Sequence, residues 1–252
     1  MGENKEAGMI ARITGFMRTQ DDAQEELKPQ RSTNEQRAKL KAEAIAVNRR
    51  AYQLYQDDDW NHYQTHKDVT LSYKESPENS GEIIRIDMTV DAPVDVAISA
   101  LLPLHIRAVW DPDVKEYVIE ELDENIQVMH TTYVTRGFVA KLISPRDFCR
   151  LEYVKKHNDD LSSMTYTSVD HPGCKQLKGF VRGVMYTSGF FCQRNLEDRS
   201  KTDVVFIYHL DPKVPIIPYR LLRFTIFRRG FQMADQMKAA ILERNEKTLS
   251  SN

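Results

Sequence analysis

Residues 84–90 read IRIDMTV, a strict alternation of apolar and polar side chains. Successive side chains of a strand point to opposite faces, so this period predicts a strand with one buried face and one solvated face. Further strand-like stretches follow at 114–121, 126–134, 148–156, 161–168, 180–191 and 204–211. Turn signals such as NDD at 158–160 separate them. The pattern predicts a long antiparallel meander.

Helices frame this run of strands. Ser32 and Glu35 have the spacing of a capping box, and an apolar stripe of helical period follows them until the acidic run at 57–59. Pro93 suits the start of a short helix, and the segment from about 219 to 244 reads as a final helix. A helix, strands, short helices, a meander and a terminal helix are typical of the α+β class.

We place one domain over residues 34–246, between an N-terminal extension of 1–33 and a short tail of 247–252. The extension is polar apart from an apolar island at 9–17. This island fits either a flexible tail or an amphipathic helix that lies on a membrane.

The composition is that of an ordinary globular protein, with 41% apolar and 29% charged residues in a chain of 252. A net charge of -2 provides no general attraction to nucleic acid, so we expect no such partner. Cys149, Cys174 and Cys192 are widely spaced and predict free thiols in a reducing compartment. With no apolar run of membrane-spanning length and no secretory signal, we expect a cytoplasmic protein. We also expect a monomer.

A curved antiparallel sheet with a long helix across its mouth encloses an interior. Such interiors are filled by side chains or hold a ligand, and periodicity alone leaves both open.

Five short segments make the chain more specific. In order they are RAVWD at 107–111, LISPRDF at 142–148, HP at 171–172, GFVRG at 179–183 and DP at 211–212 with Pro215. In this order and spacing they resemble the START (StAR-related lipid transfer) family, over about residues 34–243. The stretches around 141–148 and 188–192 are most similar to short, stand-alone members that bind sterols or bile acids. Phospholipid-binding members share the same frame.

The resemblance implies a helix-grip fold, in which a curved antiparallel sheet and the C-terminal helix enclose one tunnel for one lipid. It implies a lipid-binding protein that transfers a sterol-like lipid or a phospholipid between membranes, without a cofactor. A lipid-sensing module is one alternative. The other is an enzyme that acts on the lipid with Glu152, Tyr133 or His130 as proton donors or acceptors.

Several tunnel residues follow from the resemblance. Phospholipid-type members direct the arginine matching Arg107 at the lipid phosphate, and Asp111, one helical turn on, is its expected partner within the protein. Phe148 and Tyr186 match aromatic positions that face a choline group by cation–π attraction. The alternative for both rings is plain core packing.

Cholesterol-type members resemble this chain but place an acid and an arginine in the cavity, at positions that match Tyr133 and Glu152. Neither residue matches, which favours a different polar contact for the cargo. We interpret it as Tyr133 donating to Glu152. The alternative is that Glu152 faces solvent on an edge strand.

The final helix carries Met233 and Met237 one turn apart, with Ile226 and Ala240 near the same side. This stripe predicts that the two methionines face the tunnel, since methionine adapts to a flexible ligand. Plain packing of the helix on the sheet has the same geometry.

The segment 135–145, TRGFVAKLISP, has an apolar tip flanked by Arg136 and Lys141. Matching loops in the family meet the C-terminal helix at the tunnel mouth. We expect the tip to form a gate that dips into a membrane interface. The alternative is a loop held against the helix by the same apolar residues. The tip residues are Phe138, Val139, Leu142 and Ile143.

Between Pro212 and Ala234 the chain has five basic residues and no acid. They are Lys213, Arg220, Arg223, Arg228 and Arg229. This local excess predicts weak, transient docking on an anionic membrane, mainly through Arg220, Arg223 and Arg228. An ordinary solvated helix face is the alternative. On one unbroken helix, Arg229 falls on the side of Met233.

No catalytic motif appears in the chain. His130, His171 and His209 lie on separate predicted elements without metal-ligand spacing, and the GxSxG, HExxH and P-loop spacings are missing. We therefore expect no metal site and no enzyme activity.

Overall fold

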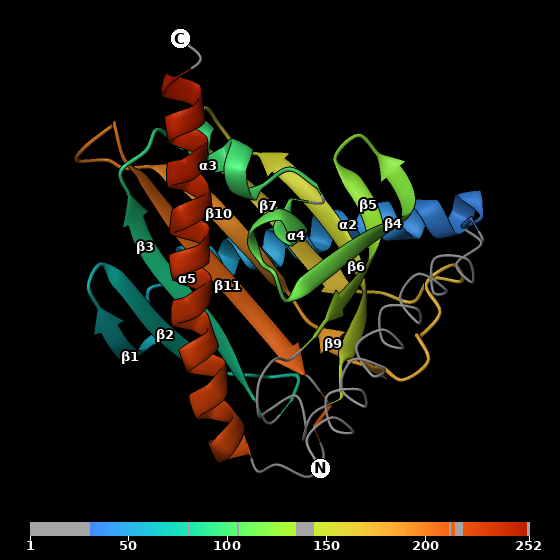
Figure 1. The fold of residues 1–252 in the computed structure, drawn as a ribbon. Helices are drawn as coiled ribbons and strands as arrows, with labels where there is room; N and C mark the ends of the chain where they lie inside the picture. Colours follow the sequence, from blue (N-terminus) through green and yellow to red (C-terminus); the bar gives the residue numbers. More distant parts are fainter. Residues whose placement is uncertain are drawn as a thin grey trace, which may run out of the picture.

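The computed structural model describes residues 31–79, 81–104, 106–134, 144–211, 213–214 and 219–250, and for 219–222 the backbone alone (Figure 1). The described helices are α2 (Asn34–Gln56), α3 (Val94–Leu101), α4 (Arg107–Trp110) and α5 (Tyr219–Leu249). The described strands are β1 (Asn61–His66), β2 (Val69–Glu75), β3 (Glu82–Val90), β4 (Val114–Asp123), β5 (Ile126–Tyr133), β6 (Arg146–Lys156), β7 (Leu161–Ser168), β8 (Val181–Arg182), β9 (Val184–Met185), β10 (Ser188–Arg194) and β11 (Thr202–Asp211).

One large sheet organises the molecule, in the order β1-β2-β3-β11-β10-β7-β6-β5-β4. Neighbours along this path are antiparallel, while β8 runs parallel to β6 and β9 pairs with β11. After β3 the chain crosses through α3 and α4 to the far edge of the sheet and returns strand by strand until β11 lies beside β3. The described sheet is open, because β1 and β4 form two separate edges.

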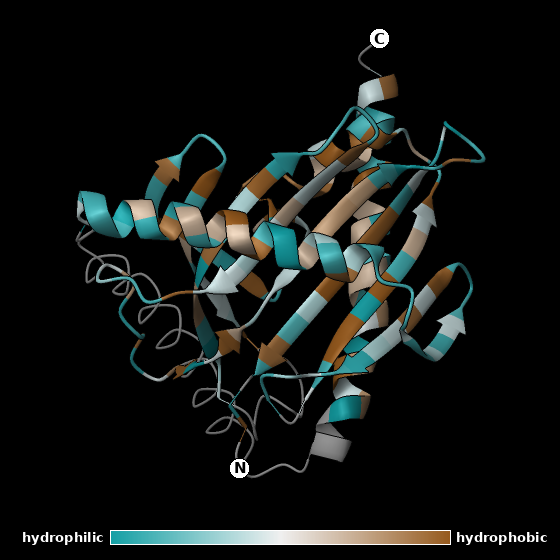
Figure 2. Cartoon of the chain, turned by 180° about the vertical axis from the view of Figure 1, so that it is seen from behind, coloured by the Kyte–Doolittle hydropathy of each residue, from teal (hydrophilic) through white to brown (hydrophobic). Residues whose placement is uncertain are grey.

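Helices α5 and α2 cover opposite faces of the sheet, as the views from the front and from behind show (Figures 1 and 2). We call the face under α5 the inner face and the face under α2 the outer face. On β3, Ile84, Ile86 and Met88 join the inner cluster with side chains of α5, whereas Ile83 joins an outer cluster with α2. The alternation at 84–90 is therefore a strand with two faces, and the α+β helix-grip prediction is confirmed.

The capping box of α2 begins one residue later than the sequence predicted. Thr33 is the N-cap: its Oγ1 accepts from the Gln36 backbone N at 3.3 Å, and its own N donates to Gln36 Oε1 at 2.8 Å. Ser32 instead contacts the domain, with its N donating to Glu120 at 3.0 Å and its Oγ 2.8 Å from His171 Nε2. Tertiary contacts thus outweighed the slightly better capping propensity of serine.

Other elements also differ from those predicted from the sequence. The exposed, polar edge strand β1 has no apolar alternation and was not predicted. The expected strand over 180–191 is split into β8, β9 and β10. Helix α5 extends to Leu249 and passes Gly230 without a break. A Cβ on Gly230 would lie 2.9 Å from the Leu71 side chain, so the glycine serves the close approach of α5 to the sheet.

Candidate functional site

The inner face has an apolar half and a polar half. The apolar half comprises β2, β3, β10 and β11 under α5. In the polar half, the registers of β4, β5 and β6 bring Glu116, Thr131 and Phe148 side by side, and likewise Gln127 and Glu152. Arg150 lies on β6 between Phe148 and Glu152. Arg107 on α4 and Asp111, the residue that caps the end of α4, lie beside it. The polar group consists of Arg107, Asp111, Glu116, Gln127, Thr131, Tyr133, Arg150 and Glu152.

Arg150 is the centre of this polar group and has no exposed surface. Its Nη2 lies 2.6 Å from Glu116 Oε1 and also bonds Glu152, which accepts from Gln127 Nε2 at 3.2 Å. Burial opposes the charge of Arg150, but Glu152 and Glu116 outweigh it and raise the pKa of the guanidinium. Its Cζ also lies 4.9 Å from the centre of the Tyr166 ring. The arginine is therefore held in its charged form inside the protein.

Arg107 projects from α4 beside this cluster. Its Nη2 is 3.5 Å from Asp111 Oδ2, and Asp111 is the partner that the sequence analysis expected. The guanidinium lies 5.7, 5.2 and 5.9 Å from the ring centres of Trp110, Tyr133 and Phe206. Burial lowers the pKa of Arg107, but nearby groups, Tyr133 first, outweigh it and raise the pKa overall. An aromatic wall on one side, one long ion pair and a side-chain hydrogen bond with Tyr166 hold Arg107 in place.

Several polar atoms in this region are buried and have no hydrogen-bond partner among the described residues. A buried polar atom without a partner costs about 1–3 kcal/mol, and native proteins seldom keep several together. Their concentration on the inner face marks it as a site for a polar ligand group. The atoms are Arg107 Nε, Trp110 Nε1, Gln127 Oε1, Thr131 Oγ1, Arg150 Nε and Arg150 Nη1.

The predicted hydrogen bond from Tyr133 to Glu152 is wrong. Tyr133 pairs with Arg146 and Glu152 with Gln127, so six residues of β6, about 20 Å, separate the two rows. The alternative is also wrong, because Glu152 is 1% exposed and β6 lies between β5 and β7. Tyr133 belongs to the inner face through its contact with Arg107. Burial raises the pKa of its hydroxyl, which therefore stays protonated.

The two predicted choline-facing rings do not pair with each other. Phe148 is buried on the inner face, edge-on to Tyr133 with ring centres 5.5 Å apart. A Cβ on Gly183 would lie 2.3 Å from the Phe148 ring, so this packing requires glycine. The ring centres of Tyr186 and His209 lie 4.5 Å apart. Val205 and Ile207, at alternate positions of β11 from His209, belong to the outer cluster. Tyr186 therefore lies apart from Phe148, because the chain breaks the strand period between β9 and β10.

Met233 and Met237 are buried on α5 in the inner cluster, and Ile226 and Ala240 pack against the same cluster. The helical stripe is thus as expected. Lining a tunnel and packing on the sheet share this geometry, so the tunnel role of the methionines stays a prediction.

The gate residues Phe138, Val139, Leu142 and Ile143 lie outside the described residues, and so does the side chain of Arg220. Arg223 is paired within the protein, and its contact with a membrane stays a prediction. It binds Glu82 at 2.9 Å, and its guanidinium lies 4.5 Å from the Tyr73 ring centre, so its charge is compensated within the protein.

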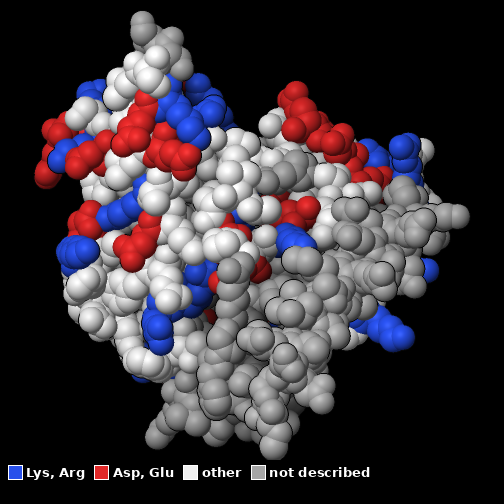
Figure 3. Space-filling model, in the orientation of Figure 1, with Lys and Arg blue, Asp and Glu red and all other residues white. Residues whose placement is uncertain are grey.

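The remaining basic residues also divide. Arg228 is exposed, whereas Arg229 turns inward to Asp111, as one unbroken helix requires. Lys213 pairs with Asp211 at 2.6 Å. Figure 3 shows basic and acidic side chains interspersed on the α5 side of the molecule, not a surface of one sign.

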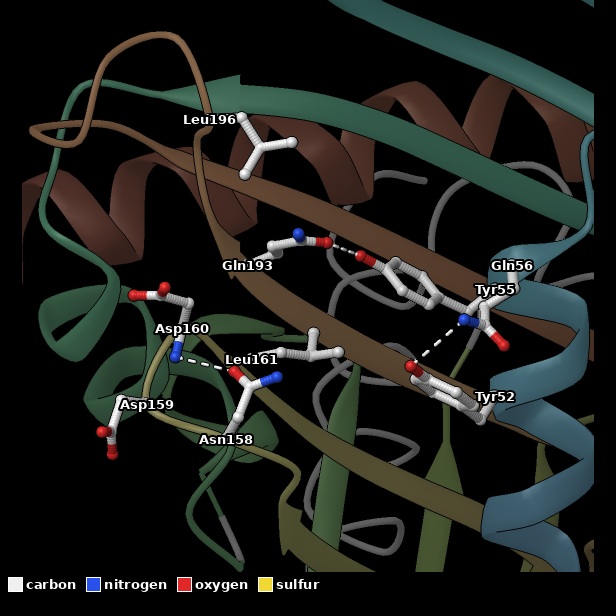
Figure 4. A pocket seen from close by; sticks show the side chains of 9 residues that line it. All are labelled: Tyr52, Tyr55, Gln56, Asn158, Asp159, Asp160, Leu161, Gln193 and Leu196. Carbon is white, nitrogen blue, oxygen red and sulfur yellow. Dashed lines mark hydrogen bonds between the residues drawn. The ribbon is translucent and has the colours of Figure 1, made fainter.

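A pocket of about 500 Å³ lies on the outer side, between the end of α2 and two hairpins (Figure 4). Tyr55 donates to Gln193 across it, and its rim acids Asp159 and Asp160 pair with Lys156 and Arg194. It shares no side chain with the polar group of the inner face. The pocket is therefore separate from the candidate site.

The sequence missed Glu116, Gln127, Thr131 and Arg150. They lie on strands where polar and apolar residues alternate, and such polar positions normally predict a face exposed to solvent. Only the position of α5 above that face makes it an interior. None of the described helices has the length and apolarity needed to cross a membrane.

Comparison with known proteins agrees with the fold. A family model described as the START domain matches residues 42–248. StAR-related lipid transfer protein 5 of Homo sapiens is 32% identical over 146 residues, which are 57% of this chain and 68% of that protein. StAR-related lipid transfer protein 4 of Homo sapiens is 30% identical over 142 residues, 56% of this chain and 67% of that protein.

The solved structure of human StAR-related lipid transfer protein 5 superposes with a TM-score of 0.75 at 26% identity, covering 82% of this chain and 98% of that one. The fold and the matched length agree. The chain belongs to the START domain family.

Proposed function

We propose that the protein binds one lipid between the inner face and α5 and carries it between membranes. One observation supports this most directly: buried polar atoms without partners face the same interior as an apolar wall. Such a site matches an amphiphile, with one polar end and an apolar body. Each buried methylene is worth about 0.8 kcal/mol, so a carrier removes most of the cost of moving a lipid through water.

The charge of the site favours an uncharged, sterol-like cargo over a phospholipid. Among the described side chains, two buried arginines and the partly exposed Arg229 face three buried carboxylates, so no positive charge is left over for a phosphate. A phosphate brought into this interior would lose its hydration without a free cation to replace it. A hydroxyl or carbonyl oxygen needs only donors, which Arg107, Thr131 and Arg150 supply. The buried charges are Arg107, Arg150, Asp111, Glu116 and Glu152.

The proposed carrier works as a monomer in the cytoplasm and touches anionic membranes transiently. Phe224 and Arg228 support this role, because they lie one turn apart on α5 and both are exposed, Phe224 by 66%. An aromatic ring beside a basic side chain suits a membrane interface. The gate segment 135–145 is the second contact that we propose.

The test is native mass spectrometry of the purified protein, followed by extraction of the bound lipid and exchange into liposomes. We expect one neutral lipid per chain that exchanges into phosphatidylcholine vesicles. A bound phospholipid would overturn the cargo class. Lipid that binds but does not exchange would identify a sensing module, and chemically altered lipid would identify an enzyme.

A further inference from the structure

Asp111 connects the polar group of the inner face to α5. Its side chain is fully buried, and its two carboxylate oxygens bind two different arginines. Oδ1 lies 2.5 Å from Arg229 Nη2 on α5, and Oδ2 lies 3.5 Å from Arg107 Nη2 on α4. Oδ1 also accepts from the backbone N of Asp113 at 3.3 Å. The carboxylate therefore favours Arg229.

Arg229 lies at the boundary between this interior and solvent, with 25% of its side chain exposed. Its Nη1 donates to Gln236 Oε1 at 2.9 Å, and its Nη2 is 3.7 Å from Asp113 Oδ2. These contacts orient the guanidinium toward Asp111. Arg229 thus provides an ionic contact between α5 and the α4 region.

The unequal distances have a consequence for Arg107. A contact of 3.5 Å is at the long limit of a hydrogen bond, and Arg107 Nε has no partner among the described residues. Arg107 therefore keeps donors directed at the interior. Without Arg229, Asp111 would be a buried acid with Arg107 as its remaining arginine, and a buried pair closes to its best geometry. Arg107 would then be turned away from a ligand.

We propose that Arg229 is a positioning residue for the cargo: by binding Asp111 it holds α5 over the interior and keeps the Arg107 donors available to an acceptor oxygen of the lipid. This inference rests on the proposed lipid-binding function. Arg229 acts through Asp111 and does not itself contact the cargo. Loss of Arg229 therefore loosens the helix and weakens the cargo contact together.

The test uses the full-length protein with R229Q, which replaces the charged guanidinium by a neutral amide that can still donate a hydrogen bond. R49Q is the matched control, because it makes the same change at an exposed arginine on α2, on the other face of the sheet. R229K is the conservative variant and returns a cation to Asp111. The cargo probe is dehydroergosterol, loaded from phosphatidylcholine vesicles, and its release is followed by its fluorescence.

For R229Q we expect release to accelerate about tenfold and affinity to weaken, within the range of coupling between groups of one ionic network. R229K should restore most of both, and R49Q should match the parent. A melting temperature lowered in R229Q with unchanged release and affinity would overturn the proposal, because it would mean a structural role alone.

Two measurements on the lipid-free protein keep the inference separate from the proposed function. Amide exchange in 223–241 should accelerate in R229Q and not in R49Q. In a Trp60→Phe background, the emission of Trp110, which lies 5.7 Å from Arg107, should shift in R229Q only. If the parent takes up no lipid, the proposed function fails, and these two measurements alone decide whether Arg229 positions α5 and Arg107. Identical exchange and emission in both variants would overturn that role.

Discussion

Arg150 has no exposed surface and is balanced by Glu116 and Glu152, two carboxylates that are buried with it. A buried ion pair contributes little net stability, since the loss of hydration offsets the attraction. Removing one partner is costly, because the others remain charged and buried. This asymmetry explains how the interior keeps a charged group with two nitrogens, Nε and Nη1, that have no partner among the described residues and remain available for binding.

The first prediction separates the structural role of Arg150 from its binding role. Arg150→Met leaves two buried carboxylates without a cation, so we expect a loss of about 3–5 kcal/mol in the free energy of unfolding, measured with denaturant. The triple variant Arg150→Met, Glu116→Gln and Glu152→Gln removes all three charges and should recover most of that loss. Sterol titration should still find at least about tenfold weaker binding. Parental affinity in the triple variant would exclude Arg150 from cargo binding.

The second prediction concerns His209. Burial lowers its pKa to about 4, against the opposing effect of Asp211. Its Nε2 is 2.7 Å from Ser76 Oγ, and its Nδ1 is 3.6 Å from Glu78. The unfolded chain binds the proton near pH 6.5 and the folded chain only near pH 4, so stability is present above pH 6.5 and falls as the pH drops toward 4, by about 3 kcal/mol.

Denaturant unfolding at a series of pH values measures this loss, and His209→Gln, which can still bond Ser76, should flatten the curve between pH 6.5 and 4. The buried carboxylates Glu120 and Asp147 have pKa values lowered to about 2 and act only below pH 4.5. Protonation of these two carboxylates therefore lowers the stability of the protein only at a pH below most of the range in which His209 acts. An unchanged slope above pH 4.5 in His209→Gln would assign the effect to another group.

At the scale of elements, α5 combines two requirements. Its inner stripe packs Phe227, Met233 and Met237 on the sheet, and Gly230 permits the close approach to Leu71. Its other side carries Phe224 and Arg228 in solvent. One helix therefore closes the interior and presents a surface to the outside, so that a change at the surface reaches the cargo site through a single rigid element.

The third prediction tests whether Met233 and Met237 line the space for the lipid. Each is replaced by Trp, alone and together. If they face the lipid, the added volume should reduce sterol uptake severalfold while thermal melting shows a folded protein. Met237→Leu, which conserves volume, is the control and should bind like the parent. Full uptake by a folded double variant would assign both methionines to packing alone.

At the scale of the whole molecule, the charges on the α5 side are mixed and largely paired, as with Arg223 and Glu82 (Figure 3). The sequence predicted a docking surface of Arg220, Arg223 and Arg228. Among the described side chains, we now expect Arg228 beside Phe224 to make the main contact. A contact with so few charges is weak and reversible. A carrier that must leave each membrane needs such a contact.

The fourth prediction is that Arg228→Glu slows transfer of a fluorescent sterol to vesicles with anionic lipid severalfold and spares binding in solution. Raised salt should slow the parent in the same way, because it screens exposed charges. Arg49→Glu is the matched control: it makes the same charge change at an exposed position on α2, on the other face of the sheet. Equal rates for Arg228→Glu and the parent at low salt would remove Arg228 from membrane docking.

The sequence by itself determined the class of fold, most element boundaries and the family. Local signals carry this information: the alternation at 84–90 reports the strand, and the five segments in order report the family. It also predicted that Arg107 and Asp111 pair, since residues four apart on one helical turn face each other.

Only the tertiary structure decided which polar residues meet in the interior. Glu116, Gln127 and Arg150 lie on three strands, and their approach depends on registers that local pattern leaves open. The same registers separate Tyr133 from Glu152, between which the sequence analysis predicted a hydrogen bond. The Arg229–Asp111 contact spans 118 positions and exists because α5 crosses the sheet at one particular place. These contacts depend on packing between residues that are far apart in the sequence, and the periodicity of apolar residues along the chain does not predict such packing.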